Sequence, residues 1–197
     1  MRFFKRIKEL EEAVSQLSAK VAINKVRIKA NDWLDNVTVK FENKSPHINP
    51  YYAKEGDSGF DLRAWIKEDD EGVRTDENGN RYILMFPLER RLIRTGIKFE
   101  LPQHCEAQVR PRSGCSLKVG LSVLNSPGTV DLCFRGEVSI IAVNVSNDTV
   151  TVTDGDRIAQ CVICPALNSN HVHLEEVEAV DTNTDRGEGG FGHTGTK

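Results

Sequence analysis

Apolar residues in the first thirty positions recur at alternating spacings of three and four. This spacing brings one residue per turn to the same side of an α-helix and is typical of a heptad seam. It predicts an amphipathic helix from about Phe4 to Ala30, in a segment that we bound at residues 1–30. The seam positions are Ile7, Leu10, Val14, Leu17, Val21, Asn24 and Ile28.

Three settings fit this helix. In the first, the helix forms a coiled coil, in which the polar seam residue Asn24 would help to fix the register. In the second, it packs on its own domain. In the third, it lies as a basic helix on an anionic surface. The sequence leaves the three open, and the partner of a coiled coil is unknown.

The pattern changes from Trp33 onward, where short β-branched runs alternate with turn residues. Val37–Phe41 alternates with period two, and Arg81–Phe86 follows an Asn78-Gly79 turn. Many short strands with such punctuation predict an all-β sandwich or jelly roll, here over residues 31–180. The other predicted strands are Ile93–Leu101, Glu106–Arg110, Leu121–Leu124, Gly136–Asn144, Thr149–Val152 and Arg157–Ile163.

The end of the chain, residues 181–197, is polar and rich in glycine, which predicts a flexible tail. Its last twelve residues, Arg186–Lys197, hold five glycines, one arginine and one phenylalanine. Glycine lets backbone N–H groups approach an anion, and arginine offers a bidentate fork for phosphate. A lone aromatic ring is suited to cover a planar ligand. Such a tail could fold over a nucleoside phosphate, although glycine-rich ends are also common without a function.

Charge is unevenly distributed along the 197 residues, whose net charge is −3. Residues 1–30 hold eight Lys and Arg against three Glu, a net of +5, so the rest of the chain carries −8. A negative body argues against direct nucleic-acid binding by the main domain.

Nothing in the sequence predicts export or membrane insertion. The basic start lacks the apolar stretch of a signal peptide, and no run approaches the ~20 apolar residues of a membrane span. The five cysteines include Cys161 and Cys164 in an apolar run, which favours buried strand thiols over a redox or zinc pair. We therefore expect a soluble cytoplasmic protein.

Three short stretches carry candidate chemistry. In Arg110–Gly114, a predicted strand gives way to a turn, where Arg112 and Ser113 offer a guanidinium and a hydroxyl to a phosphate. Asp131 interrupts an apolar run, so it is either exposed at an edge or has a chemical task. Gln160 follows a turn and can donate an amide N–H. Taken singly, each stretch is more often structural than functional.

Five stretches, taken together and in their order along the chain, favour a functional interpretation. They resemble the five ordered motifs of trimeric dUTP diphosphatases (dUTPases), over about residues 36–197 and without the N-terminal helix. The resemblance implies a distorted jelly-roll β-barrel that forms a homotrimer, with three active sites assembled from all three subunits. The stretches are Ser58–Ala64, Arg110–Gly114, Gly128–Glu137, Gly155–Gln160 and Arg186–Gly192.

The resemblance also implies roles for single residues. Asp131 matches the family's water-activating aspartate, and Asp61 matches an aspartate that helps to hold hydrated Mg²⁺ indirectly, through water. Phe191, followed by Gly192, matches the tail aromatic that stacks on uracil. The positions that match phosphate contacts are Arg112, Ser113, Gly114, Gln160 and, for the γ-phosphate, Arg186. The hairpin that reads uracil in the family corresponds to Asn125, Gly128 and Val130.

Three positions depart from the family pattern. Phe134 stands where tyrosine is usual, so the flat surface under the deoxyribose remains and the phenol is lost. Cys133 replaces a residue that is often acidic, and His193 stands where serine is usual, which removes a hydroxyl contact.

The implied reaction is the hydrolysis of dUTP to dUMP and pyrophosphate by Mg²⁺-assisted attack of water on the α-phosphorus. This reaction limits uracil entry into DNA and supplies dUMP. One alternative is a dCTP deaminase of the same fold, which needs a glutamate in the strand after the third motif, whereas Val138–Asn144 holds no carboxylate. The other is a nucleotide-switched regulatory module that binds a protein partner, a role that the N-terminal helix would serve.

Overall fold

The computed structural model describes residues 12, 14–18, 20–21 and 37–190. The chain divides into two compact units, Met1–Ala166 and Leu167–Lys197. The described strands all belong to the first unit, and residues 167–190, the part of the second that the structure describes, contain neither helix nor strand. The predicted boundary of the tail at residue 181 stays a prediction.

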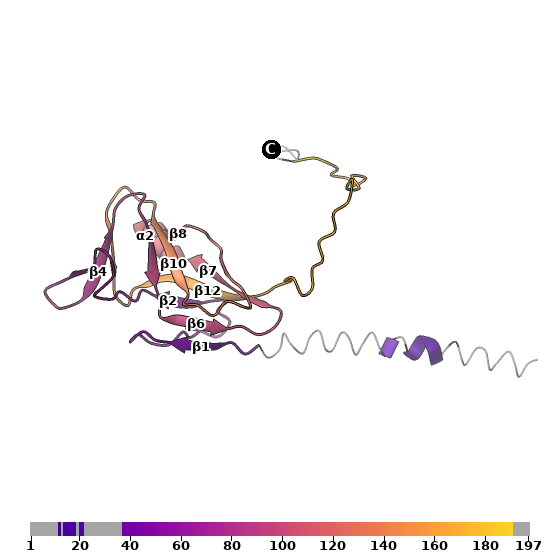
Figure 1. Ribbon diagram of the computed structural model, residues 1–197, viewed down its shortest axis with the longest axis horizontal. Helices are drawn as coiled ribbons and strands as arrows, with labels where there is room; N and C mark the ends of the chain where they lie inside the picture. The colour runs from indigo at the N-terminus through magenta and orange to yellow at the C-terminus, as the bar shows by residue number, and fades with distance from the viewer. Residues whose placement is uncertain (1–11, 13, 19, 22–36, 191–197) are drawn as a thin grey trace, which may run out of the picture. The chain divides into compact units, whose positions relative to one another are not determined.

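Between residues 37 and 166, the first unit is built from short strands and one short helix (Figure 1). All the strand pairs are antiparallel. The elements are β1 (Lys40–Asn43), β2 (Phe60–Arg63), β3 (Arg74–Thr75), β4 (Arg81–Met85), β5 (Arg90–Arg94), β6 (Ile97–Glu100), β7 (Cys105–Pro111), α2 (Ser113–Val119), β8 (Leu121–Val123), β9 (Gly128–Val130), β10 (Ser139–Asn144), β11 (Val150–Thr153) and β12 (Arg157–Pro165).

Four sheets enclose one hydrophobic core. Their strand orders are β2-β12-β7-β9, β5-β10-β8, β11-β4-β3 and β1-β6. In β7, Cys105, Ala107 and Val109 are buried while the residues between them stay partly exposed, as expected of strands with one face on a core. Figure 1 shows β12 beside β2 and β7, and β1 alongside β6, in agreement with their backbone pairing. The prediction of an all-β fold is confirmed.

The prediction of one strand over Ile93–Leu101 is wrong. The chain breaks at Gly96, whose φ is +73°, into β5 and β6, which pair in different sheets. A Cβ on Gly96 would lie 2.6 Å from the backbone nitrogen of Ser45, so this crossing needs glycine. The isolated glycine inside the strand pattern is the one local sign of the break.

The expected turn after Arg110 is also wrong, because Ser113 begins helix α2. The helix buries none of its residues and ends at Gly120, whose φ is +72°. A seven-residue helix with a glycine inside it and no apolar face lacks the periodicity by which helices are predicted. Two predicted strands begin three residues later than expected, β1 at Lys40 rather than Val37 and β10 at Ser139 rather than Gly136.

Part of the predicted N-terminal helix lies within the described residues. Residues 12, 14–18, 20 and 21 are helical, and the seam residues Val14, Leu17 and Val21 are 63%, 66% and 49% exposed. Phe4–Ala30 otherwise lies outside the described residues, including the seam positions Ile7, Leu10, Asn24 and Ile28. The full length of the helix therefore stays a prediction.

All five cysteines are free thiols. Cys161 is fully buried in β12, and burial raises the pKa of its thiol to about 12, so it behaves as a core side chain. Among the residues that the structure describes, no helix is long and apolar enough to cross a membrane.

Two glycines with positive φ separate the effect of backbone strain from that of a clash. Gly79→Ala has space, since nothing lies within 4 Å of the added Cβ. It should cost only the left-handed strain of ~1–2 kcal/mol. Gly96→Ala should cost about 3 kcal/mol or more, because it adds overpacking against Ser45. Urea unfolding of both variants measures the difference, and equal losses would contradict the account of the β5–β6 break.

Candidate active site

Adjacent strands bring the predicted phosphate-binding residues together. In the ladder of β12, the backbone of Gln160 pairs with Asp61 of β2 on one side and with Arg110 of β7 on the other. Arg112 stands one residue beyond the end of β7, and the Gln160 side chain donates to the Pro111 carbonyl at 2.8 Å. The register of the sheet therefore gathers residues that are up to about a hundred positions apart in sequence.

The carboxylate of Asp61 lies between two guanidinium groups. Arg112 Nε is 2.6 Å from Oδ1, and Arg157 Nη1 is 3.1 Å from Oδ2. Two positive charges face one negative charge, so the cluster keeps a net charge of +1. The exposed face of such a cluster attracts an anion, and the guanidinium fork suits a phosphate.

Arg112 remains charged in this setting. Burial of its guanidinium disfavours the charged form, but hydrogen bonds to Asp61 and to the Cys115 thiol outweigh this effect and raise the pKa of Arg112. A third contact, from Nη1 to the Arg157 carbonyl at 3.3 Å, holds the guanidinium against the start of β12. The side chain is therefore fixed before any ligand arrives.

Ser113 and Gly114 continue this surface at the start of α2. Both are exposed, and nothing lies within 4 Å of the place where a Cβ on Gly114 would stand. A pocket of about 260 Å³ adjoins the cluster, and Asp61, Arg157 and Gln160 form part of its wall. Of the predicted phosphate contacts, Gln160 lines this pocket, and Arg112 pairs with Asp61 of its wall.

The residues of the predicted uracil hairpin gather at a second place. β8 and β9 flank the turn that carries Asn125, and β9 pairs with β7 through Val109 and Gly128. A Cβ on Gly128 would lie 3.2 Å from Asn125 Nδ2 and 3.4 Å from Val109 Cβ, so the hairpin is closely packed there.

A pocket of about 330 Å³ opens beside this hairpin. Asn125, Gly128, Asp131 and Phe134 line it. Asp131 directly follows β9 and is exposed, which agrees with both earlier interpretations, an edge position and a chemical task. The Phe134 ring lies over Gly136, where an added Cβ would come within 2.6 Å of the ring, so glycine leaves room for this aromatic surface.

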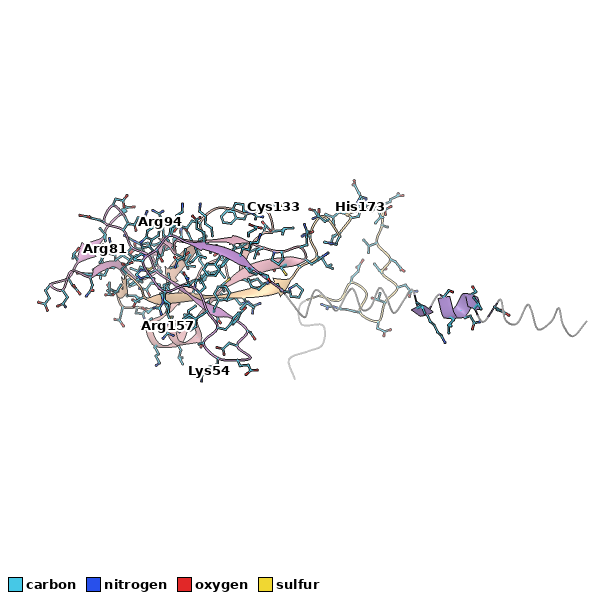
Figure 2. All side chains as sticks on the ribbon, turned by 90° about the horizontal axis from the view of Figure 1, so that it is seen from below. Lys54, Arg81, Arg94, Cys133, Arg157 and His173 are labelled. Carbon is cyan, nitrogen blue, oxygen red and sulfur yellow. The ribbon has the colours of Figure 1, made fainter. Side chains whose placement is uncertain are left out.

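The two places lie far apart within one chain. Val130 pairs with Ala107, so Asp131 lies opposite Glu106, six residues before Arg112 along β7. At the rise of a β-strand, this separation is about 20 Å. Figure 2 agrees, since Arg157 and Cys133, two residues after Asp131, lie on opposite sides of the body of strands. One copy of the chain does not bring Asp131 and Arg112 to a common phosphate.

One further carboxylate lines the hairpin pocket. Glu137 accepts hydrogen bonds from Arg94 Nη2 at 2.9 Å and from the Gly96 N–H at 2.8 Å. Burial raises the pKa of this carboxyl, but these hydrogen bonds outweigh burial and lower it. Glu137 is therefore an ionised group with both oxygens in use.

The tail carries the remaining predicted residues. Within the second unit, Arg186 is exposed, and its Nε donates to the Gly189 carbonyl at 2.8 Å across a short turn. Phe191, Gly192 and His193 lie outside the described residues.

The residues near Asp61 fit a hydrated Mg²⁺ only in part. The described residues contain no cluster of three His, Cys, Asp or Glu side chains, so no all-protein metal cage exists among them. Mg²⁺ usually keeps several waters and uses one or two carboxylates together with substrate phosphates. Among the described residues, Asp61 Oδ1 accepts a hydrogen bond from Arg112, and a carboxylate oxygen has two lone pairs. One position is therefore left for a metal-bound water.

Two residues of these sites have no role that follows from the sequence. Arg157, inside the fourth family motif, pairs with Asp61. Glu137, at the end of the third motif, accepts hydrogen bonds from Arg94 and Gly96 beside the hairpin pocket. Both contacts join positions that are distant in sequence, so no local pattern signals them.

Comparisons with known proteins agree with the geometry. The profile of the dUTPase family matches residues 79–195. The chain is 43% identical over 158 residues to a deoxyuridine 5'-triphosphate nucleotidohydrolase of Cytophaga hutchinsonii, covering 80% of this chain and 92% of that protein. The same-named protein of Finegoldia magna is 44% identical over 157 residues, covering 80% and 98%.

Solved structures show the same fold. The dUTPase of Staphylococcus bacteriophage 80alpha, in a structure with dUpNHpp, superposes with a TM-score of 0.63 at 22% identity, covering 80% of this chain and 98% of that chain. With a matching family profile over more than half its length, and with relatives of more than 40% identity over most of theirs, the chain belongs to the dUTPase family.

Proposed function

We propose that this protein hydrolyses dUTP to dUMP and pyrophosphate. The observation that carries the proposal is the placement of Asp131 at the pocket beside the closely packed hairpin of Asn125 and Gly128. A carboxylate beside a slot for a flat base is what attack on the first phosphate of a nucleotide requires. Two relatives are named deoxyuridine 5'-triphosphate nucleotidohydrolase, which supports dUTP as the substrate.

In the proposed reaction, Asp131 accepts a proton from water while the water oxygen bonds to the α-phosphorus and the bond to the pyrophosphate oxygen breaks. Arg112, Ser113, Gly114 and Gln160 bind the phosphates, and Arg186 holds the γ-phosphate. These donors stabilise the negative charge that develops on the phosphate oxygens. When bound, Mg²⁺ would add to this charge neutralisation, with Asp61 as its indirect ligand through water.

Selection of uracil would come from the hairpin backbone. Main-chain donors and acceptors at Gly128 and Val130 would pair with the edge of the base, which cytosine would mismatch. The narrow space would also crowd the methyl group of thymine. Phe134 would pack under the deoxyribose, and Phe191 with Gly192 would cover the base when the tail closes and excludes water.

The site would require more than one copy of the chain. Asp131 and Arg112 are about 20 Å apart along β7, whereas catalytic and binding contacts act over about 3 Å. A triphosphate is shorter than that span, so the hairpin of one copy would meet the Arg112 cluster of another. This incompleteness supports the proposed homotrimer and jelly-roll assembly, in which the symmetry would repeat the shared site three times.

The observations disfavour deamination of dCTP. β10 (Ser139–Asn144) holds no carboxylate, and the nearest one, Glu137, is ionised and occupied by Arg94 and Gly96. A proton carrier needs a group that can take up and release a proton near neutral pH. The remaining alternative is a regulatory module, for which the exposed seam residues Val14, Leu17 and Val21 offer an apolar stripe without a known partner.

Removing the proposed base tests the reaction directly. Asp131→Asn should keep binding of dUTP and lose about 100- to 10,000-fold in kcat, because the water loses its base while the phosphate contacts remain. Pyrophosphate release and binding of dUpNHpp are the two measurements. Near-normal turnover would exclude Asp131 from the mechanism.

Removing the tail tests the role of the second unit. A chain without residues 184–197 should stay folded with the same oligomeric state, because these residues hold a single large apolar side chain, Phe191. It should lose most activity, since Arg186 and Phe191 are removed together. Light scattering and a dUTP assay measure the two effects. Unfolding or dissociation of the truncated protein would show instead that the tail is structural.

A further inference from the structure

The side chain of His47 connects two segments that border the pocket of Asp61, Arg157 and Gln160, which we call the phosphate-side pocket. His47 precedes Ile48 and Asn49, which form one wall of that pocket. Its Nε2 lies 3.0 Å from Oδ1 of Asp154, which lies in the turn between β11 and β12. The two side chains are 18% and 14% exposed, so water competes little with this contact. Neither residue belongs to any of the five family motifs.

Asp154 is a fixed anchor. Its Oδ1 also accepts the Ile66 N–H at 2.7 Å, its Oδ2 accepts Arg81 Nη2 at 3.2 Å, and its own N–H donates to the Arg81 carbonyl at 2.8 Å. A carboxylate only accepts hydrogen bonds, so His47 Nε2 carries the hydrogen. The anchor is therefore set by β4 and by the chain after β2, and it does not depend on His47.

The segment that His47 holds is tied together from within. The side-chain amide of Asn43 donates to the His47 carbonyl at 2.9 Å and to Asn49 Oδ1 at 3.0 Å. Ser45 donates to Asn43 Oδ1 through both its N–H and its hydroxyl. Residues 43–49 thus form one unit, and the imidazole joins this unit to the turn before β12.

The same turn positions the phosphate cluster. Gly155 has a φ of +90°, and a Cβ there would lie 3.3 Å from His47 Cε1, so the ring packs closely on the glycine. The Gly155 carbonyl accepts Arg63 Nη1 at 2.7 Å, and two residues later Arg157 begins β12 and pairs with Asp61. A shift of the turn would move the first residues of β12, where Arg157 lies.

We infer that His47 is a positioning residue for the triphosphate: it holds the Ile48–Asn49 wall of the pocket against the turn that places Arg157 and Gln160. This inference rests on the phosphate site proposed above. His47 acts through Asp154 and Gly155 and has no part in the chemical step. Its loss should therefore weaken binding of the phosphates and leave binding of the base and sugar unchanged.

Three substitutions test this positioning role. His47→Ala removes the contact, His47→Asn leaves an amide too short to span it, and His47→Gln supplies an N–H donor of similar reach. We expect dUpNHpp to bind at least fivefold more weakly to the Ala and Asn variants and within twofold of wild type to the Gln variant. Binding of dUMP, which lacks the β- and γ-phosphates, should stay within twofold in all three.

Two control variants distinguish failure of the His47 inference from failure of the proposed phosphate site. Lys40→Ala breaks an exposed ion pair with Glu100 on nearby β1 and should change neither affinity. Arg112→Gln should weaken dUpNHpp. If it does not, the phosphate site itself is wrong and the inference fails with it. If Arg112→Gln weakens dUpNHpp while folded His47→Ala and His47→Asn bind it as wild type does, only the role of His47 is overturned. Equal losses of affinity for dUpNHpp and dUMP, or a His47→Gln variant that binds no better than His47→Ala, would also overturn the role of His47. Either result would indicate general disturbance of the structure.

Discussion

The backbone ladder of β12 is the constraint on which both candidate binding places depend. Nine residues, Arg157–Pro165, pair with β2 on one side and over seven positions with β7 on the other. Because side chains alternate across a strand, a slip of one residue would turn Gln160 toward the core and a core side chain outward. The register is held by the burial of Ala159 and Cys161, whose side chains are fully enclosed. Core packing thus determines the position of Gln160 and of the other residues proposed to bind phosphate.

β7 then separates the two halves of the chemistry. Its far end leads to Arg112, and its near end lies beside β9 and Asp131, about 20 Å away. The length of β7 fixes this separation, so within one chain Asp131 and Arg112 cannot contact the same nucleotide phosphate. The proposed association of identical copies would complete both halves with no additional residues, because symmetry would bring the hairpin of one copy to the cluster of another. Stability of the assembly and activity would then be linked.

The sequence predicted the class of the fold and most strands, since period-two alternation and turn residues are local signals. It failed at Gly96 and at Ser113, where the deciding factors are a close approach of Ser45 from another sheet and a helix without an apolar face. The family motifs named the residues of the candidate site, but not their partners. That Arg157 pairs with Asp61, and that His47 reaches Asp154, are contacts across about a hundred positions, which no local pattern encodes.

The central claim, that one active site takes Asp131 and Arg112 from different copies, can be tested by mixing two variants, each of which should lose most activity on its own. Asp131→Asn and Arg112→Gln subunits are unfolded together, refolded at equal amounts and assayed for dUTP hydrolysis. If random trimers form with each site shared between neighbours, one site in every mixed trimer is intact, which predicts recovery of about a quarter of wild-type activity. Activity no higher than that of the separate variants, in trimers shown to be mixed, would contradict the account and place both residues in the site of a single chain.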